Sequence, residues 1–562
     1  MLETIFTYLI EDTYQSPFRD EYSSLSVLST QSKQDLLSCA LSCKALFDPA
    51  IGILWHTVEL FPLMKLLPGF CVLFGDDDCV ELYSFTQEVE YNNMTLARFD
   101  LYASKVRRLI LLDRDNIDDF TTEDIEIPEA IQQRLANARP RPIPFFTHLY
   151  CSAAWFLDKM IFMVSPLLKS AHFYVPPVEE IMQLLPILER DAPLLQSMSV
   201  DMFRNGDEDC ILLISRLKNL RTLVLTLTPV CSISEPLVLD LQALQHLRHL
   251  EHLEELTIDL RGTGFHNTSP PIHTGPSSTS LKRLTLFFSL GNATIVASTV
   301  MDMFRDSSME YLAFTSDLEV EHSQTILAQI PSRYTLQPVS SFIAPLYAIQ
   351  GLETLEVYLS NRFYTSDTDI SNICHAWPNL TRLVLATSTT PEDKRRQLPT
   401  VAGSIPRLAK SCPRLKELEM TLNVTHLSVI PNPSNELCHY RINDGCNRWS
   451  AQGGVYIDRM PTTIYSPDHA HKLELLHLYV DKDDFDVCNQ LDGPTVFAYH
   501  LDRAFPFLKT VRYTSGEEDS EDSEDSEDDD GYARIAREHA WYGVNGALTL
   551  CQEVRRRHGV QL

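Results

Sequence analysis

The sequence predicts an α/β fold in which a long array of leucine-patterned repeats follows a small all-helical unit. Two observations support this prediction. A Leu-x-x-Leu-x-Leu pattern returns many times from about residue 100 onward, and the first sixty residues carry apolar side chains at helical spacing. Many steps of 25 to 35 residues between copies fit a strand, a turn and a helix per repeat. We therefore expect a solenoid with parallel strands on its concave face and helices outside.

Each copy of the repeated pattern contains alternating apolar residues, as expected for a short strand with one buried face. A single copy is weak evidence, but a dozen copies favour a repeat array over the alternative, a mixed α/β globule. The clear copies begin at Leu220, Leu253, Leu281, Met309, Leu352, Leu380, Leu415, Leu473 and Leu508. Weaker copies begin at Val106, Phe146, Leu168 and Leu195.

Four copies share a proline at one offset, in the form apolar-Pro-x-Leu. Proline at this place stops the preceding helix and sets an extended path into the strand. The four motifs begin at Ala192, Trp377, Cys412 and Phe505. In this respect the array resembles the cysteine-containing class of leucine-rich repeat.

The N-terminal segment predicts three short helices. The first presents four apolar residues at i, i+3, i+4 and i+7. The second spans Asp35 to Phe47 and is apolar nearly all round. We expect Asp48-Pro49 to cap and start the third helix, which ends near Trp55. Helices this short cannot bury so much apolar surface by themselves. The rest of the chain or a partner must cover the surplus.

The segments Leu2 to Leu9, Leu36 to Phe47 and Ile51 to Trp55 resemble the F-box, and large fungal F-box families most of all. The resemblance implies a module that docks on the Skp-type adaptor of a cullin-based ubiquitin ligase. The usual Leu-Pro pair before the first helix is absent, and the loop between helices one and two is long. The alternative is that the helices only cap the repeat array. The adaptor-binding residues that the resemblance implies are Leu2, Ile5, Phe6, Leu9, Leu36, Leu37 and Leu41.

These patterns divide the chain into five parts. The predicted parts are an F-box-like helical domain at 1–60, a linker or N-terminal capping region at 61–100, a repeat solenoid at 101–514 with insertions near 262–280 and 432–471, a disordered acidic run at 515–531, and a C-terminal helix at 532–562. Tyr440, Trp449 and Tyr456 make the second insertion either a set of binding anchors or a decoration packed on the solenoid edge.

Composition limits the partners that the chain can have. Its net charge of −29, of which eleven negative charges lie between Glu517 and Asp530, argues against binding to nucleic acid. No signal peptide and no stretch long enough to span a bilayer are present, so no membrane partner is expected. Thirteen scattered cysteines suit reduced thiols and a cytoplasmic or nuclear location.

Motifs for catalysis, phosphate loops and dinucleotide binding do not occur, so we expect neither an enzyme nor a cofactor. His246, His249 and His252 are the best candidates for metal ligands, but their i, i+3, i+6 spacing drifts across a wide arc of a helix. We expect a solvated helix face there. His469 and His471 could share one side of a strand, without further ligands nearby.

The sequence therefore favours a substrate receptor of a cullin-based ubiquitin ligase, with the F-box-like unit on the adaptor and the strand-lined face on an unidentified target protein. One alternative is an adaptor-independent repeat scaffold or an acidic chaperone for basic proteins. Another is a decayed F-box that no longer binds an adaptor.

We predict that the acidic run is phosphorylated. Ser515 and Ser526 each have an acidic residue three positions later, as acid-directed kinases prefer, and phosphate on Ser526 would extend the signal to Ser523 and then Ser520. Phosphate mapping of the native protein should find these serines modified. Unmodified serines would instead indicate a plain solvated spacer.

Overall fold

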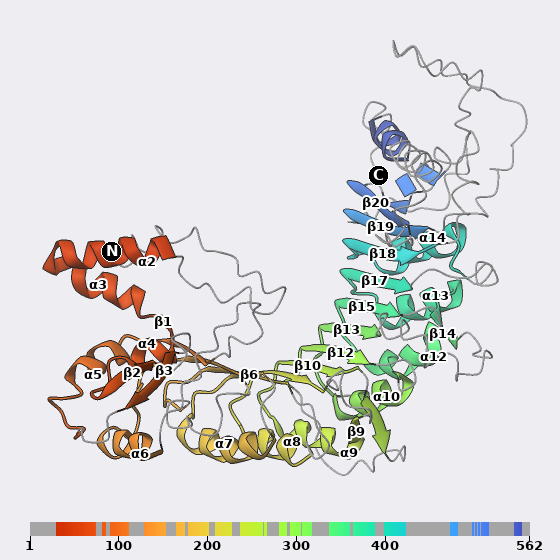
Figure 1. Cartoon of the computed structure of the whole chain (residues 1–562). Coiled ribbons are helices and arrows are strands. Elements are labelled where there is room, and N and C mark those ends of the chain that lie inside the picture. The colour runs from red at the N-terminus through yellow and green to blue at the C-terminus, as the bar shows by residue number, and fades with distance from the viewer. Residues whose placement is uncertain are drawn as a thin grey trace, which may run out of the picture. The chain divides into compact units, whose positions relative to one another are not determined.

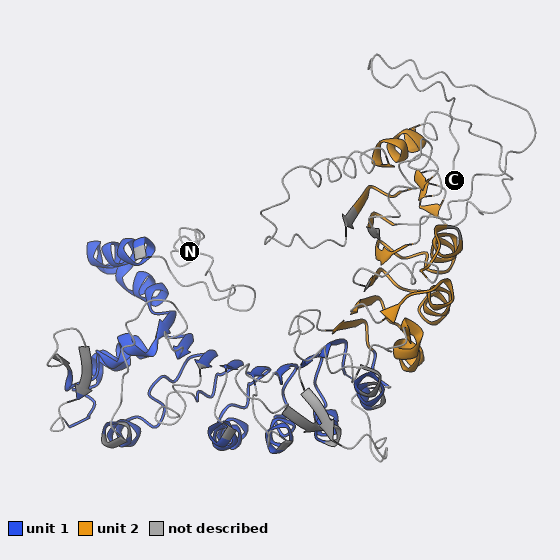
Figure 2. Ribbon diagram, turned by 45° about the vertical axis from the view of Figure 1, so that its right-hand side comes forward, with its two compact units in different colours: residues 1–308 blue, residues 309–562 orange. Residues whose placement is uncertain are grey.

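The chain forms two compact units, residues 1–308 and residues 309–562 (Figure 2). Both contain parallel strands and helices, as Figure 1 shows. The computed structural model describes residues 30–74, 81–85, 90–111, 129–152, 164–174, 178–201, 208–227, 237–261, 263–266, 280–288, 293–304, 306–316, 337–359, 363–387, 398–422, 473–480, 497–498, 501–502, 504–505, 507–515 and 544–553. The insertion predicted at 432–471 lies outside these residues.

In unit 1 the main sheet is built from consecutive parallel strands in the order β1-β4-β5-β6-β7-β8-β10-β12. Strands that are adjacent in this sheet therefore also follow one another along the chain, with helices and short strands of other sheets between them. The strands are β1 (Thr57–Glu59), β4 (Arg108–Leu111), β5 (His148–Ser152), β6 (Ser170–Tyr174), β7 (Ser197–Asp201), β8 (Thr222–Thr226), β10 (Glu255–Leu260) and β12 (Arg283–Phe288).

In unit 2 the order β13-β15-β17-β18-β19-β20 is again parallel throughout. Every predicted copy of the leucine pattern in the two units coincides with one strand of a main sheet. This arrangement is consistent with an α/β fold of the leucine-rich-repeat type. The strands are β13 (Tyr311–Ser316), β15 (Thr354–Leu359), β17 (Arg382–Thr387), β18 (Glu417–Thr421), β19 (Leu475–Val480) and β20 (Thr510–Ser515).

Alternation along each strand separates a buried row from an open row. In β7 and β8 the second and fourth residues are buried, and their neighbours are half-buried. The first apolar residue of each copy also turns inward: Leu220, Leu253 and Leu281 are fully buried. Burial of each leucine side chain contributes about 1.5–3 kcal/mol, which explains the strict apolar choice at these positions.

Within each unit, a forked hydrogen bond joins the start of a main-sheet strand to the start of the strand before it. Two consecutive N–H groups, of Glu254 and Glu255, donate to the carbonyl oxygen of Arg221 at 2.7 and 2.9 Å. Lys282 and Arg283 donate in the same way to Glu254. The fork recurs in both units and sets the register of the strands.

Several helices line one side of the main sheet of unit 1 (Figures 1 and 2). They are α6 (Glu129–Ala138), α7 (Val178–Asp191), α8 (Glu208–Ile214) and α10 (Ala293–Phe304). In unit 2, α13 (Asp367–Ala376) and α14 (Val401–Ser411) take this place. We call the opposite side of each sheet its open face. The shorter elements are α9 (Leu241–Leu244), η4 (Gln245–His249), α12 (Val339–Ile343), η7 (Ala344–Ala348), and the parallel pairs β9 (Leu237–Asp240) with β11 (Thr263–His266) and β14 (Gln337–Pro338) with β16 (Phe363–Tyr364).

The proline motifs act as the sequence predicts. Helices α7, α13 and α14 each end at the residue just before the motif begins. The first motif residue still donates its N–H to the helix, as Trp377 does to the carbonyl of Ile373 at 2.9 Å. The leucine of the motif then turns back, with Leu380 donating to the carbonyl of Trp377 at 3.3 Å. Proline therefore marks the change from helix to strand.

The N-terminal region differs from the prediction in two ways. Helices α2 (Thr30–Ser42) and α3 (Lys44–Leu54) meet at Cys43, whose backbone is extended, so Pro49 lies inside α3 rather than starting a new helix. The sheet also begins at β1, inside the range predicted to be only helical. Its copy of the pattern has Trp55 and Val58 in place of the two leucines that most of the clear copies have.

The region predicted as a linker or cap, 61–100, is largely folded where it is described. It contains α4 (Leu60–Met64), an antiparallel hairpin of β2 (Phe70–Phe74) and β3 (Glu81–Phe85), and the start of α5 (Ala97–Ala103). Phe61, Phe70 and Phe85 form successive edge-to-face ring contacts with centroids 6.0 and 5.5 Å apart. These contacts attach the hairpin to α4.

The C-terminal segment caps the last strand of unit 2. Residues 544–553 are helical, with Val544 and Leu548 buried. Asn545 accepts from the N–H of Val511 at 3.2 Å and donates to the carbonyl of Val511 at 3.1 Å. Gln552 donates to the carbonyl of Leu508 at 2.8 Å. Such contacts satisfy the backbone groups that an edge strand leaves unpaired, as expected for a helix that folds back on the array.

We predict that Trp377→Ala lowers the free energy of unfolding by about 3–5 kcal/mol, because a fully buried ring is replaced by a cavity. The variant also loses the hydrogen bond from the indole N–H to the carbonyl of Ile349 at 2.9 Å. Urea unfolding of the full chain measures the change. Phe507→Ala removes a half-exposed ring from another proline motif and should cost less than about 1 kcal/mol. Equal effects of the two substitutions would contradict this account of the motif.

Candidate protein-binding surfaces

Helices α2 and α3 pack against each other as a small pair with its own core. Leu36 and Ala40 of α2 and Ala50 and Ile51 of α3 are buried there. Around them lie the partly buried side chains of Cys39, Leu46, Phe47, Ile53, Leu54, Trp55 and Tyr102. The pair is thus closed on the side where its two helices meet. We call it the helical pair.

In the described structure, two contacts attach the helical pair to α5 and to the turn that follows it. The rings of Trp55 and Tyr102 lie with centroids 4.5 Å apart, and Lys105 Nζ lies 3.4 Å from a carboxylate oxygen of Asp48. The aromatic contact carries most of the attachment, because the ion pair is solvent-exposed on the Asp48 side and such pairs contribute little.

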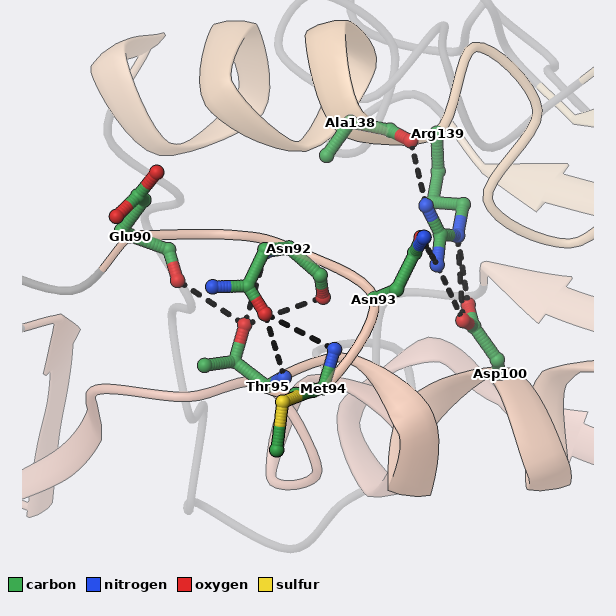
Figure 3. A network of polar contacts seen from close by, with 8 residues as sticks. All are labelled: Glu90, Asn92, Asn93, Met94, Thr95, Asp100, Ala138 and Arg139. Carbon is green, nitrogen blue, oxygen red and sulfur yellow. Dashed lines mark hydrogen bonds and ion pairs between the residues drawn. The ribbon is translucent and has the colours of Figure 1, made fainter.

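A polar network holds α5 in turn (Figure 3). Arg139, which follows α6, donates from Nε and Nη2 to both carboxylate oxygens of Asp100 on α5 at 2.7–3.2 Å. It also donates to Asn93 at 2.9 Å and to the carbonyl of Ala138 at 2.7 Å. Asn92 caps the turn before α5 by accepting from the N–H groups of Met94 and Thr95. A bidentate guanidinium–carboxylate pair fixes both distance and angle, so the support of the helical pair is positioned rather than loosely tethered.

One strip of α2 is left uncovered. Leu37 is 46% exposed and Leu41 is 75% exposed, and their i, i+4 spacing puts them side by side on the helix. Leu36 instead is 4% exposed and belongs to the core of the pair. This corrects the expectation that all three leucines are available to an adaptor: Leu36 faces α3, so the chain itself covers it. Leu2, Ile5, Phe6 and Leu9, the other four expected adaptor-binding residues, lie outside the described part of the chain.

The open face of unit 1 gathers basic and aromatic residues on β4, β5 and β6. The strand register aligns Arg108 with His148, and His148 with Ser170. Two residues further along these strands, it aligns Tyr150 with His172. The rings of Tyr150 and His172 are stacked, with centroids 4.8 Å apart and an angle of 5° between their planes. Ser170 Oγ lies 3.0 Å from His172 Nε2.

Burial and neighbouring basic groups lower the pKa values of the histidines on this face. Burial, with His148 nearby, lowers the pKa of His172 to about 4. Burial, Arg108 and Lys169 lower the pKa of His148, and burial with Arg108, Arg107 and His148 does the same for the pKa of His56.

The open face of unit 2 is different, because its charges pair with one another. Arg382 of β17 lies between Glu356 of β15, 2.8 Å from Nε, and Glu417 of β18. Tyr311 donates its hydroxyl to Glu356 at 3.2 Å. His477 Nδ1 lies 3.6 Å from a carboxylate oxygen of Glu419. In this network three carboxylates, of Glu356, Glu417 and Glu419, lie beside one arginine and one histidine, so carboxylates are in surplus.

The histidines proposed as metal candidates do not assemble a site in the described structure. The rings of His246 and His249 on η4 lie with centroids 6.4 Å apart. Among the described residues, no group of three or more His, Cys, Asp or Glu side chains is arranged to hold a metal ion. His469 and His471 lie outside these residues, as do Ser520, Ser523 and Ser526, while Ser515 is the last residue of β20.

Sequence inspection missed the basic and aromatic residues of β4 to β6. Their signal was present, since Arg108 and His148 each stand two positions after the first apolar residue of a copy. Tyr150 and His172 each stand four positions after it. Alignment of the copies position by position would have placed these side chains on one face.

Comparisons with known proteins leave the family open. No protein-family model matches the chain, and no curated protein matches it. Among solved structures, the chain is similar to one in the crystal structure of the mouse RP105/MD-1 complex, with 12% identity and a TM-score of 0.21. The match covers 55% of this chain and 59% of that chain. At this score the likeness supports no argument, so the strand pairing itself establishes the repeat fold. In the described part, no helix has the length and apolarity needed to cross a bilayer.

We predict that His172→Gln makes the protein less sensitive to acid. The pKa of His172 is about 4 in the folded state and about 6.5 when unfolded, so the unfolded chain takes up the proton first and stability falls as pH drops below 6.5. Between pH 6.5 and pH 5 this group should cost the wild type about 1.5 kcal/mol. Urea unfolding at both pH values measures the difference. His375→Gln, at an exposed site of α13, is the matched control and should keep the wild-type loss.

Proposed function

We propose that the protein is a substrate receptor of a cullin-based ubiquitin ligase. In this proposal the helical pair docks on a Skp-type adaptor, and the open faces of the repeat sheets bind the target. The observation that carries the proposal is the uncovered Leu37 and Leu41 strip. It lies on the segment that resembles the second F-box helix, next to a core that is already filled.

The size of the strip suits a docking contact. Complete burial of two leucine side chains contributes about 1.5–3 kcal/mol each, and both are far from buried in the free chain. Interfaces place their energy in a few buried anchors, and residues Leu2 to Leu9 are the further anchors that the resemblance implies.

The proposed mechanism is positioning rather than catalysis. The helical pair rests on α5 through Trp55 and Tyr102, and the Arg139–Asp100 pair fixes α5 within the same unit that carries β4 to β6. A target held on that sheet would therefore keep a defined distance from the adaptor. Repeat stacks suit this task, because each repeat is fixed by its neighbours.

A cytoplasmic or nuclear location accompanies this proposal. Cys39, Cys43, Cys71, Cys374 and Cys551 carry free thiols, as expected where thiols are kept reduced.

A second candidate function is an adaptor-independent scaffold for basic proteins. The carboxylate surplus on the open face of unit 2 and the net charge of −29 favour it. Salt-sensitive histone binding that disappears on deletion of 517–530 would support this candidate over the ligase receptor.

We predict that Leu37→Asp and Leu41→Asp each weaken adaptor binding at least tenfold, because each buries a charge where a leucine would be desolvated. The assay is a pull-down of the full chain with a purified Skp-type adaptor, followed by titration. Met94→Asp changes a side chain that is 88% exposed outside the helical pair and should bind like the wild type. Wild-type binding by both leucine variants, or no binding by the wild type, would contradict the proposal.

A further inference from the structure

Arg107, Arg108 and Lys169 lie at the starts of β4 and β6 and pair with no carboxylate of the described residues. Arg108 Nε is buried and has no hydrogen-bond partner among the described residues. Among the described residues, the Arg107 guanidinium donates to the carbonyls of Ser104 and Val106, at 2.8 and 3.0 Å, and lies 5.7 Å from the ring centroid of Phe145. With His148, Lys169 and His172, these arginines make what we call the basic strand patch: Arg107, Arg108, His148, Lys169 and His172.

Cations at matching positions further along the same sheet do have partners. Arg221 and Lys282 stand where Arg107 and Lys169 stand, at strand starts, and both pair with Glu254 at 3.0 and 3.2 Å. Arg283, in the row of Arg108, lies 3.7 Å from Glu255. The same backbone geometry therefore accommodates ion pairs, and the sequence omits the acids at β4 to β6.

Like charges at neighbouring positions repel one another, so an anion bound beside Arg107, Arg108 and Lys169 would stabilise this part of the sheet. The flanking strands contribute Glu59 of β1 and Asp201 of β7 to this face in the described structure, and both have other contacts. Glu59 and Asp201 lie at the two edges of this group of strands. An extended segment with two or three anionic side chains would instead lie across the aligned positions of Arg108 and His148.

We propose that the basic strand patch binds an acidic segment of a partner protein in extended conformation. Carboxylate or phosphate groups of the segment pair with Arg108 and Lys169, and its neighbouring side chains pack on the stacked rings of Tyr150 and His172. The segment is part of a ligase target only if the proposed function holds, but binding itself does not depend on the adaptor.

The test is fluorescence anisotropy of the full chain, without adaptor, and a labelled synthetic peptide in which aspartate and glutamate alternate with glycine. We expect saturable binding that weakens between about 50 and about 300 mM salt. Arg108→Gln combined with Lys169→Gln should weaken it at least tenfold. Arg221→Gln combined with Arg283→Gln removes the same charge from paired positions and should change binding less than about twofold. If the Arg108 variant does not fold, Lys169→Gln alone, at an exposed site, should still weaken binding measurably.

Proton uptake gives a second readout. In the described structure, the charged or titratable groups near His148 and His172 are Arg108, His56 and Glu59 on one side, Lys169 and Tyr150 beside them, and Asp201 on the other. A bound anion favours the protonated rings, so affinity for the carboxylate peptide should rise between about pH 7.5 and about pH 5.5. His148→Gln combined with His172→Gln should flatten this rise.

Comparison probes decide the ligand class. A peptide with phosphoserine in place of the acidic residues distinguishes phosphate from carboxylate recognition, and binding of either supports the proposal. A peptide with asparagine and glutamine should not bind. Tighter binding of single-stranded RNA, or equal loss in both double variants, overturns the proposal. Adaptor binding without peptide binding would reject this inference and leave the proposed function standing, and the reverse would reject only the proposed function.

Discussion

The fork in which one carbonyl accepts two successive N–H groups is the constraint on which each sheet depends. The carbonyl oxygen of Arg221, for example, accepts hydrogen bonds from the N–H groups of both Glu254 and Glu255. Within each unit, such a bond fixes the position along the sheet at which the next strand begins. The fixed register places apolar side chains in buried rows and leaves the residues between them free to vary. The candidate binding residues therefore lie in these open rows and in elements outside the ladder, such as the helical pair. Within unit 1, the basic strand patch and the helical pair are two such places.

The repeat fold could be predicted from sequence because its signal repeats. Each Leu-x-x-Leu-x-Leu copy became a strand, and the proline motifs located the ends of α7, α13 and α14 correctly. The failures have local causes. The first strand, β1, lacks the leucines of the other copies, and Pro49 is tolerated inside α3 because apolar contacts of Phe47 and Ile51 outweigh a missing hydrogen bond.

The candidate surfaces were harder to predict than the fold. Helix α2 is apolar nearly all round, so periodicity does not tell which leucine faces α3; the packing of Ala50 and Ile51 decides that Leu36 is inside and Leu37 is outside. The basic strand patch joins residues from three repeats, and the strand register places Arg108 beside His148. Each of these residues is of an ordinary type, so the sequence reveals the patch only when the copies are aligned position by position.

The account depends on α2 carrying apolar surface that the chain leaves for another protein. Carbene footprinting of the purified full chain, alone and with a Skp-type adaptor, measures this directly at Leu37 and Leu41. The account predicts strong labelling of both side chains in the free protein and clear protection in the complex, with Met94 labelled equally in both states. Labelling as weak as that of buried Leu36 in the free protein would show that the chain covers the strip itself, and would contradict the account.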